Sequence, residues 1–252
     1  MENDRLKRVL SVLNFLTTDG PRTVTHVSKE LNLPMSSTHD LLKAMVIAGM
    51  LQATEHGYEI GSSTVKLTYE VQKRFHRTEI AAPELKALVE KVGFDVYLAV
   101  RTGNQVTYCS HFRGKGEVNI DVPLGLPLYR HATAAGKLFA ALDREIRHEV
   151  LTGPLPRLTA RTRTDPQVLA RDFQSIAQRG ISISNEEAVS GVIGMATPIR
   201  HANGQVFAVA HISAPASSLH NGSLETGRFE TVCRELLASS AVIEEILARG
   251  LL

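Results

Sequence analysis

The sequence predicts an α+β protein in two parts: an N-terminal winged helix-turn-helix, then a larger domain with a mainly antiparallel sheet. Residues 23–60 read in succession as helix, tight turn, helix and β-hairpin. Beyond residue 77, short alternating apolar segments are separated by turn residues and flanked by helices at both ends, which is not the pattern of a doubly wound parallel sheet. The 252 residues are 43% hydrophobic and 21% charged, enough for two cores. We expect a DNA-binding module at 1–61, a linker helix at 62–76 and a second domain at 77–252.

The helices of the first module follow from local signals. Thr25 is the expected N-cap of a short helix that carries Val27 and Leu31. Pro34 suits the first turn of the next helix, and Gly49 ends it. The buried stripe of that second helix is predicted to be Leu41, Leu42, Met45 and Val46. An earlier helix over residues 5–18 completes a three-helix core through Leu6, Val9, Leu10, Leu13 and Leu16.

A hairpin and a connecting helix follow. The apolar runs 51–53 and 58–60 flank Glu55-His56-Gly57, where a glycine allows the positive φ of a hairpin loop, so the runs pair as a wing. Ser62 is the expected N-cap of a helix to about residue 75. The apolar residues of this helix do not form one stripe, which is typical of a connector between domains.

The second helix of such a module places its N-terminal residues against base edges in the major groove, where small or polar side chains fit. The residues expected to contact DNA are Arg22, Thr25, Met35, Ser36, Ser37, Thr38, His39 and Lys43. Residues 1–60 hold six Lys/Arg against seven Asp/Glu, a formal net charge of −1, so one copy should bind DNA weakly and a dimer would join two weak contacts. A protein-interaction role stays open, and the salt dependence of DNA binding separates the two.

The remaining elements are predicted from alternation, helical periodicity and turn residues. Strands are expected at 94–100, 106–111, 118–122, 181–184, 195–200 and 206–213. Helices are expected at 79–91, 131–142, 143–153, 165–178 and 224–247. The small residues at 132–136 either leave helix-start N–H groups open to a ligand or allow tight packing on the sheet; the sequence favours neither.

Several classes of function find little support. Cys109 and Cys233 show no metal-binding spacing and are expected to be buried thiols. The N-terminus lacks a signal peptide and no run of about 18 apolar residues exists, so we expect a cytoplasmic protein that does not bind membranes. Glu186 and Glu187 are adjacent, so on a strand they point to opposite sides, and no nucleophile triad or phosphate loop accompanies them. Neither an enzyme nor a cofactor is expected.

Four segments then carry a resemblance that spans nearly the whole chain. They are RLKRVLSVLNFL with NLPMSSTHDLLKAMVIAGML, GYEIGSSTVKL, LYRHATAAGKLFAAL, and GISISNEEAVSGVIGMATPIRHANGQVFAVAHISAPASSL. The last two are the more discriminating, because winged modules are widespread. Through them the chain resembles bacterial transcriptional regulators of the IclR family.

The resemblance implies a GAF-like domain whose pocket binds a small metabolite, often an organic or aromatic acid, and thereby changes operator affinity. The residues carried over to the pocket are Ile120, Ala134, Ala135, Ser184, Val192, Gly194, His211 and Ser213. The family often has an acidic residue at 184, a bulkier residue or cysteine at 194 and serine at 211, so this pocket should be roomier and less acidic. We expect a partly protonated His211 and nearby Arg130 to favour an anion.

The resemblance also implies a repressor that binds a palindromic double-stranded operator as a homodimer or tetramer. Family members often carry a basic residue at 35 and Arg at 40, where this chain has Met35 and Asp40. The operator or the reading residues should therefore differ from the family's usual pattern. The alternative functions are a winged-helix interaction module and, less well supported, an enzyme that uses the second domain's pocket.

Overall fold

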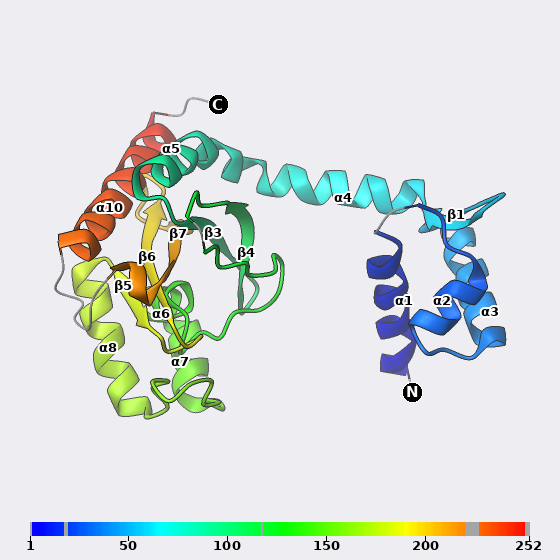
Figure 1. Ribbon diagram of the computed structural model, residues 1–252, viewed down its shortest axis with the longest axis horizontal. Coiled ribbons are helices and arrows are strands. Elements are labelled where there is room, and N and C mark those ends of the chain that lie inside the picture. Colours follow the sequence, from blue (N-terminus) through cyan, green and yellow to red (C-terminus); the bar gives the residue numbers. More distant parts are fainter. Residues whose placement is uncertain (1, 18–19, 117, 220–226, 250–252) are drawn as a thin grey trace. The chain divides into compact units, whose positions relative to one another are not determined.

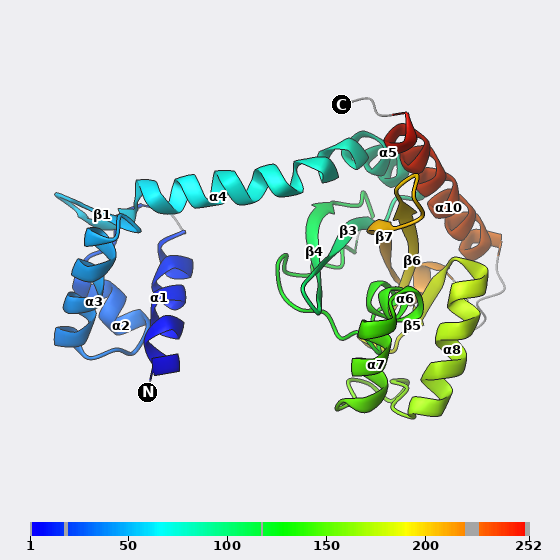
Figure 2. The same ribbon diagram turned by 180° about the vertical axis from the view of Figure 1, so that it is seen from behind.

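The computed structural model describes residues 2–17, 20–116, 118–219 and 227–249. For residues 2–4 and 72–78 it describes the backbone alone. The chain divides into two compact units, 1–77 and 78–252. Figures 1 and 2 show the elements of both units from opposite sides.

The first unit is a winged helix-turn-helix followed by a helix, as predicted. Its elements are α1 (Glu2–Leu16), α2 (Val24–Glu30), α3 (Met35–Ile47), β1 (Leu51–Thr54), β2 (Gly57–Ile60) and α4 (Ser62–Phe75). The strands pair antiparallel around a two-residue loop, with Thr54 opposite Gly57. The buried core consists of Val12, Leu16, Val27, Leu41, Leu42, Met45 and Leu51.

Two local predictions for this unit are wrong. The N-cap of α2 is Thr23 rather than Thr25, because Thr23 has the extended backbone of a cap and its hydroxyl accepts from the N–H of His26. Leu6 and Leu10 do not join the core, since they are 66% and 61% exposed on α1. Helical periodicity thus predicted an apolar stripe on α1 that is wider than the face of this helix that the first unit buries. Residue 18, in the predicted first helix, lies outside the described residues.

The second unit surrounds one five-stranded sheet. The 3₁₀ helix η1 (His76–Ala81) spans the boundary between the units. The helices of the second unit are α5 (Ala82–Val92), α6 (Ala134–Leu142), α7 (Arg144–Thr152), α8 (Pro166–Arg179), α9 (Ala216–Leu219) and α10 (Gly227–Ala248). Its strands are β3 (Asp95–Thr102), β4 (Gln105–Phe112), β5 (Ser182–Asn185), β6 (Val192–Arg200) and β7 (Val206–Pro215). The order is β4-β3-β7-β6-β5, with every pair antiparallel. The predicted α+β class is confirmed.

Helices cover both faces of this sheet (Figures 1 and 2). On one face, Tyr97 and Ala99 of β3 share a core with apolar residues of α6, α7 and α8. The alternate residues Val96 and Leu98 are also fully buried and point to the opposite face, because side chains alternate along a strand. There α5 and α10 pack against each other and against the strands. Burial on both faces explains why β3 is almost continuously apolar.

The predicted strand at 118–122 is wrong, so the described chain has five strands in this sheet rather than six. The segment is instead held by two side chains of β3. The Asp95 carboxylate accepts from the N–H of Ile120 at 2.7 Å. The Tyr97 hydroxyl donates to the carbonyl of Ile120 and accepts from the N–H of Val122 at 3.0 Å. These side chains supply the partners that a neighbouring strand would otherwise give to the backbone.

The remaining helix boundaries differ by a few residues. α6 begins at Ala134 with Thr133 as its N-cap, rather than at residue 131. α5 follows a 3₁₀ turn that occupies the predicted first residues of that helix. The predicted start of the last helix at residue 224 lies outside the described residues, and α10 is described from Gly227.

Replacing Tyr97 with Phe tests the anchoring of the 120–122 segment. We expect the free energy of unfolding to fall by about 1–3 kcal/mol, because the carbonyl of Ile120 and the N–H of Val122 lose a partner. Urea denaturation measures the change. Tyr108→Phe is the matched control, since Tyr108 is a buried tyrosine whose hydroxyl makes no hydrogen bond to the residues that the structure describes. Equal destabilisation by both substitutions would contradict the anchoring role.

Candidate functional site

A cavity of about 260 Å³ opens on the face of the sheet that α6 covers. It is lined by seven of the residues that the sequence analysis proposed: Ile120, Ala134, Ser184, Val192, Gly194, His211 and Ser213. They come from four places in the chain, namely the segment after β4, the start of α6, β5–β6 and β7. The volume and the apolar lining suit a small organic molecule.

Strand register explains why residues so far apart in sequence meet here. Ser184 of β5 lies opposite Gly194 of β6, and Gly194 lies opposite Ser213 of β7. His211 is two residues back along β7, in the row with Ala196 and Tyr97. Because positions two apart share a face, all of these residues turn toward the same side of the sheet.

His211 is the central polar group of the cavity. It is 3% exposed, its Nε2 lies 3.0 Å from the hydroxyl of Ser213, and its Nδ1 has no hydrogen-bond partner among the described residues. A Cβ at Gly194 would lie 2.8 Å from its Cε1, so the glycine makes room for the ring. Burial lowers the pKa of His211 to about 3. The expectation of a partly protonated His211 is therefore wrong, and the ring is neutral at physiological pH.

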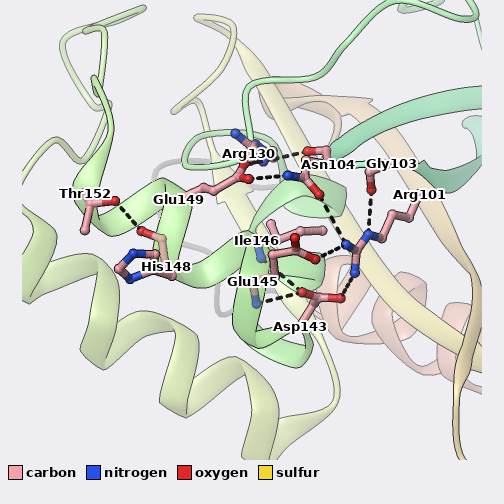
Figure 3. A network of polar contacts seen from close by, with 10 residues as sticks. All are labelled: Arg101, Gly103, Asn104, Arg130, Asp143, Glu145, Ile146, His148, Glu149 and Thr152. Atoms are coloured by element: carbon pink, nitrogen blue, oxygen red, sulfur yellow. Dashed lines mark hydrogen bonds and ion pairs between the residues drawn. The ribbon is translucent and has the colours of Figure 1, made fainter.

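Arg130 does not line this cavity, contrary to prediction. Its Nη1 donates to the carboxylate of Glu149 at 2.7 Å and to the carbonyl of Asn104 at 2.6 Å (Figure 3). The same network contains the ion pairs of Arg101 with Asp143 and Glu145. Arg130 is thus already neutralised, and no Lys, Arg, Asp or Glu is among the lining residues.

The structure shows whether the small residues at the start of α6 leave N–H groups open to a ligand or allow close packing. The Thr133 hydroxyl accepts from the N–H of Gly136 at 3.1 Å and caps the helix. A Cβ at Gly136 would lie 2.6 Å from the Cα of Arg130, so this glycine serves close packing. Ala135 belongs to the buried core and is not among the lining residues, contrary to prediction, whereas Ala134 is. Packing accounts for most of the small residues.

Sequence reasoning missed the larger part of the lining, ten of its seventeen residues. The missed residues are Tyr108, Val122, Pro123, Leu126, Pro127, Leu128, Tyr129, Thr133, Ala188 and Val189. Alternation along β4 would have indicated Tyr108. Most of the rest belong to two irregular segments, 122–129 and 188–189, whose path no local pattern predicts.

The first unit presents the start of α3 on its surface. Met35, Ser36, Ser37 and His39 are exposed there, and Lys43 is exposed further along the helix. The N-cap is Pro34, whose side chain makes no hydrogen bond to the first-turn N–H groups. These features suit contact with phosphates and base edges.

The prediction that Thr38 contacts bases is wrong. Its side chain is fully buried, and its hydroxyl donates to the carbonyl of Pro34 at 3.0 Å. It occupies the stripe of α3 that also buries Leu41, Leu42 and Met45. Counting helical positions back from Leu42 by four would have placed Thr38 in the core.

Arg22 precedes α2, and Thr25 lies on α2, the helix that packs against α3. The backbone of Arg22 exchanges two hydrogen bonds of 2.9 Å with that of Tyr58 on the wing. Thr25 is exposed on α2. Their contact with DNA stays a prediction.

Other chemistry finds no site in the part of the chain that the structure describes. No group of three or more His, Cys, Asp or Glu is arranged to hold a metal there, and no helix among these residues has the length and apolar character to cross a bilayer. Burial raises the pKa of both free thiols, that of Cys233 to about 11 with help from Glu230. The carboxylates of Glu186 and Glu187 are held in ion pairs with Arg161 and Lys137.

A winged helix-turn-helix joined in one chain to a domain with a ligand-sized pocket defines a DNA-binding regulator of the effector-binding kind. The IclR helix-turn-helix family model matches residues 6–55, and the model of the bacterial transcriptional regulator IclR C-terminal domain matches residues 70–237. The chain belongs to the IclR family of transcriptional regulators.

Relatives and solved structures agree with this assignment. The HTH-type transcriptional repressor AllR is 29% identical in Escherichia coli K12, over 85% of this chain and 81% of its own, and 30% identical in Salmonella typhimurium, over 85% and 80%. An IclR homologue from Microbacterium hydrocarbonoxydans, solved with 4-hydroxybenzoate, is 26% identical with a TM-score of 0.76, covering 96% of this chain and 98% of that one. The Thermotoga maritima IclR shares the fold, with 23% identity, a TM-score of 0.77 and 97% and 98% coverage.

The buried neutral imidazole of His211 should make stability depend on pH. Its pKa is about 3 in the folded chain and about 6.5 when unfolded, so below pH 6.5 the unfolded chain binds the extra proton. Its contribution is therefore present above pH 6.5 and is lost as pH falls toward 3, at up to about 1.4 kcal/mol per pH unit. Urea denaturation at pH 7.5 and 5.0 measures this slope, which should be shallower in His211→Gln. Identical slopes would refute the buried neutral state.

Proposed function

We propose that this chain is a repressor that binds a roughly palindromic operator as a homodimer or tetramer and changes its operator affinity when a small organic acid occupies the pocket. In this proposal residues 1–61 bind DNA, residues 62–76 link, and residues 77–252 bind the effector. The observation that carries it is the 260 Å³ cavity within a chain whose other unit exposes an uncapped helix start. The repressor relatives and the homologue bound to 4-hydroxybenzoate support it.

The pocket would receive an aromatic acid without a cationic partner. Tyr108, Ile120 and Val192 offer apolar surface for a ring. The hydroxyls of Ser184 and Ser213 can donate to a carboxylate, and Ala134 lies at the positive end of α6. Hydroxyls and a helix dipole replace the protonated His211 and Arg130 of the sequence-based hypothesis. Affinity should be moderate, because no bidentate cation is involved.

On the DNA side, exposed side chains of α3 would read bases while first-turn amides and Lys43 meet phosphates. Ser36 and His39 are the strongest readers because both are exposed. Ser37 is also exposed, but its hydroxyl donates to the carbonyl of Pro34 at 2.9 Å and is left to accept. The low positive charge of this unit makes pairing of two copies on one operator necessary for tight binding.

Coupling of the two sites is a difference in free energy. An acid that binds one arrangement of the protein more tightly than another shifts operator affinity by that ratio and no more. By the same linkage, operator DNA changes the affinity for the acid by the same factor. α4 connects the two units in sequence and is the natural carrier of such a change.

Replacing Ser36 and His39 with Ala should weaken operator binding about tenfold or more, through lost base contacts. Fluorescence anisotropy on the DNA upstream of the protein's own gene measures this against a scrambled duplex. Ser11→Ala is the matched control, because that serine is exposed on α1 and bonds only its own helix. Specific retention of the operator by the Ser36/His39 variant at wild-type affinity would refute the assignment.

Binding of 4-hydroxybenzoate should be nearly independent of pH between 6 and 8, because the carboxylate stays ionised and His211 stays neutral over this range. Isothermal titration at three pH values measures it, with an aliphatic acid of similar size for comparison. A tenfold loss of affinity per pH unit would show that a protonated histidine takes part. Absence of binding by every acid tried would exclude an acid as the ligand.

A further inference from the structure

One wall of the pocket is a short turn, residues 186–191, between β5 and β6. Ala188 and Val189 of this turn line the cavity. Glu186 takes a φ of 58°, an unfavourable backbone for a residue other than glycine, and its carboxylate accepts from the N–H of Gly191 at 2.9 Å. An unfavourable backbone of this kind persists only where hydrogen bonds and ion pairs hold it, within the turn and around it.

One of these groups is Lys137, one helical turn after Ala134 on α6. Its side chain is 1% exposed, and its Nζ lies 2.7 Å from Oε1 of Glu187 and 3.2 Å from Oδ2 of Asp172 on α8. Arg163 pairs with the same Asp172 at 2.8 Å. Two cations and two carboxylates thus balance, and all of them except the exposed Arg163 are largely buried.

A buried ammonium is costly for a domain that needs only a core. α6 already buries Leu138 and Phe139 beside Lys137, and an apolar side chain at 137 would extend that core without desolvating a charge. The ammonium instead orients the side chain of Glu187, the residue immediately before Ala188. The hydroxyls of Thr159 and Thr162 hold the carbonyls of Glu186 and Glu187 but do not orient the Glu187 side chain.

We propose that Lys137 is a positioning residue of the ligand pocket: by holding Glu187 it fixes the 186–191 turn so that Ala188 and Val189 close the wall. This inference rests on the proposed function only in calling the cavity a ligand pocket. The geometry of the turn is testable without any ligand.

The test compares the wild-type chain with the double variant K137M/E187M. The single variant K137M removes the closest cation from Glu187 and is expected to lower the melting temperature strongly. It therefore does not separate an effect on the position of the turn from an effect on the stability of the whole domain. The double variant removes one charge of each sign and keeps the Arg163–Asp172 pair. R130M/E149M is the matched control, since it deletes another pair at 2.7 Å in the same domain.

Hydrogen–deuterium exchange read by mass spectrometry follows the peptide that covers residues 186–192. We expect this peptide to exchange at least tenfold faster in K137M/E187M, with peptides of α6 and α8 unchanged and the melting temperature within a few degrees of wild type. R130M/E149M should leave the 186–192 peptide at the wild-type rate. Wild-type exchange of this peptide in a folded K137M/E187M would overturn the proposal, and so would equal acceleration in the control.

If K137M/E187M fails to fold, E187Q decides, because it keeps the size of residue 187 and weakens its 2.7 Å contact with Lys137 together with its longer 3.9 Å contact with Arg163. Faster exchange confined to the 186–192 peptide supports positioning, and an unchanged rate overturns it. Isothermal titration with 4-hydroxybenzoate adds an independent reading, in which a folded variant should bind about tenfold more weakly. No binding by the wild-type chain would count against the proposed effector class, while the exchange result still decides the role of Lys137.

Discussion

The antiparallel register that joins β5, β6 and β7 is the constraint on which the second unit depends. It sets Ser184, Gly194 and Ser213 in one row, and it places His211 over the glycine. A slip of one residue in any of these pairs would turn the affected residues to the opposite face and empty the pocket. Burial of the sheet on both faces fixes the register, because every slip would also expose apolar side chains.

Buried polar groups decide the rest of the pocket. Asp95 and Tyr97 meet the backbone of residues 120–122, which would otherwise need a neighbouring strand. Burial keeps His211 neutral, so the cavity carries a hydrogen-bonding ring rather than a charge. Lys137 donates a hydrogen bond to the carboxylate of Glu187 in the turn that forms one wall of the pocket. Asp95, Tyr97 and Lys137 find their partners far away in the sequence, whereas His211 bonds Ser213 on its own strand, and each thereby meets the need of a buried polar group for a partner.

Local signals predicted the winged module well because each signal acts over a few residues. Glycine, proline and helical spacing marked the turn, the recognition helix and the wing in the right order. The same reasoning misplaced Thr38, Leu6 and Leu10. A hydroxyl can satisfy itself on its own helix and enter a core, and an apolar stripe can be wider than the surface available to cover it.

The sequence by itself determined the order of the elements, the two-part organisation and, through its motifs, the family and most strand residues of the pocket. Only the tertiary structure decided the charge of that pocket, the course of its two irregular walls and the loss of the expected sixth strand. The reason is one of range. Propensity and periodicity are set by neighbours along the chain, whereas the ionisation of His211 and the pairing of Arg130 with Glu149 depend on groups that only folding brings together.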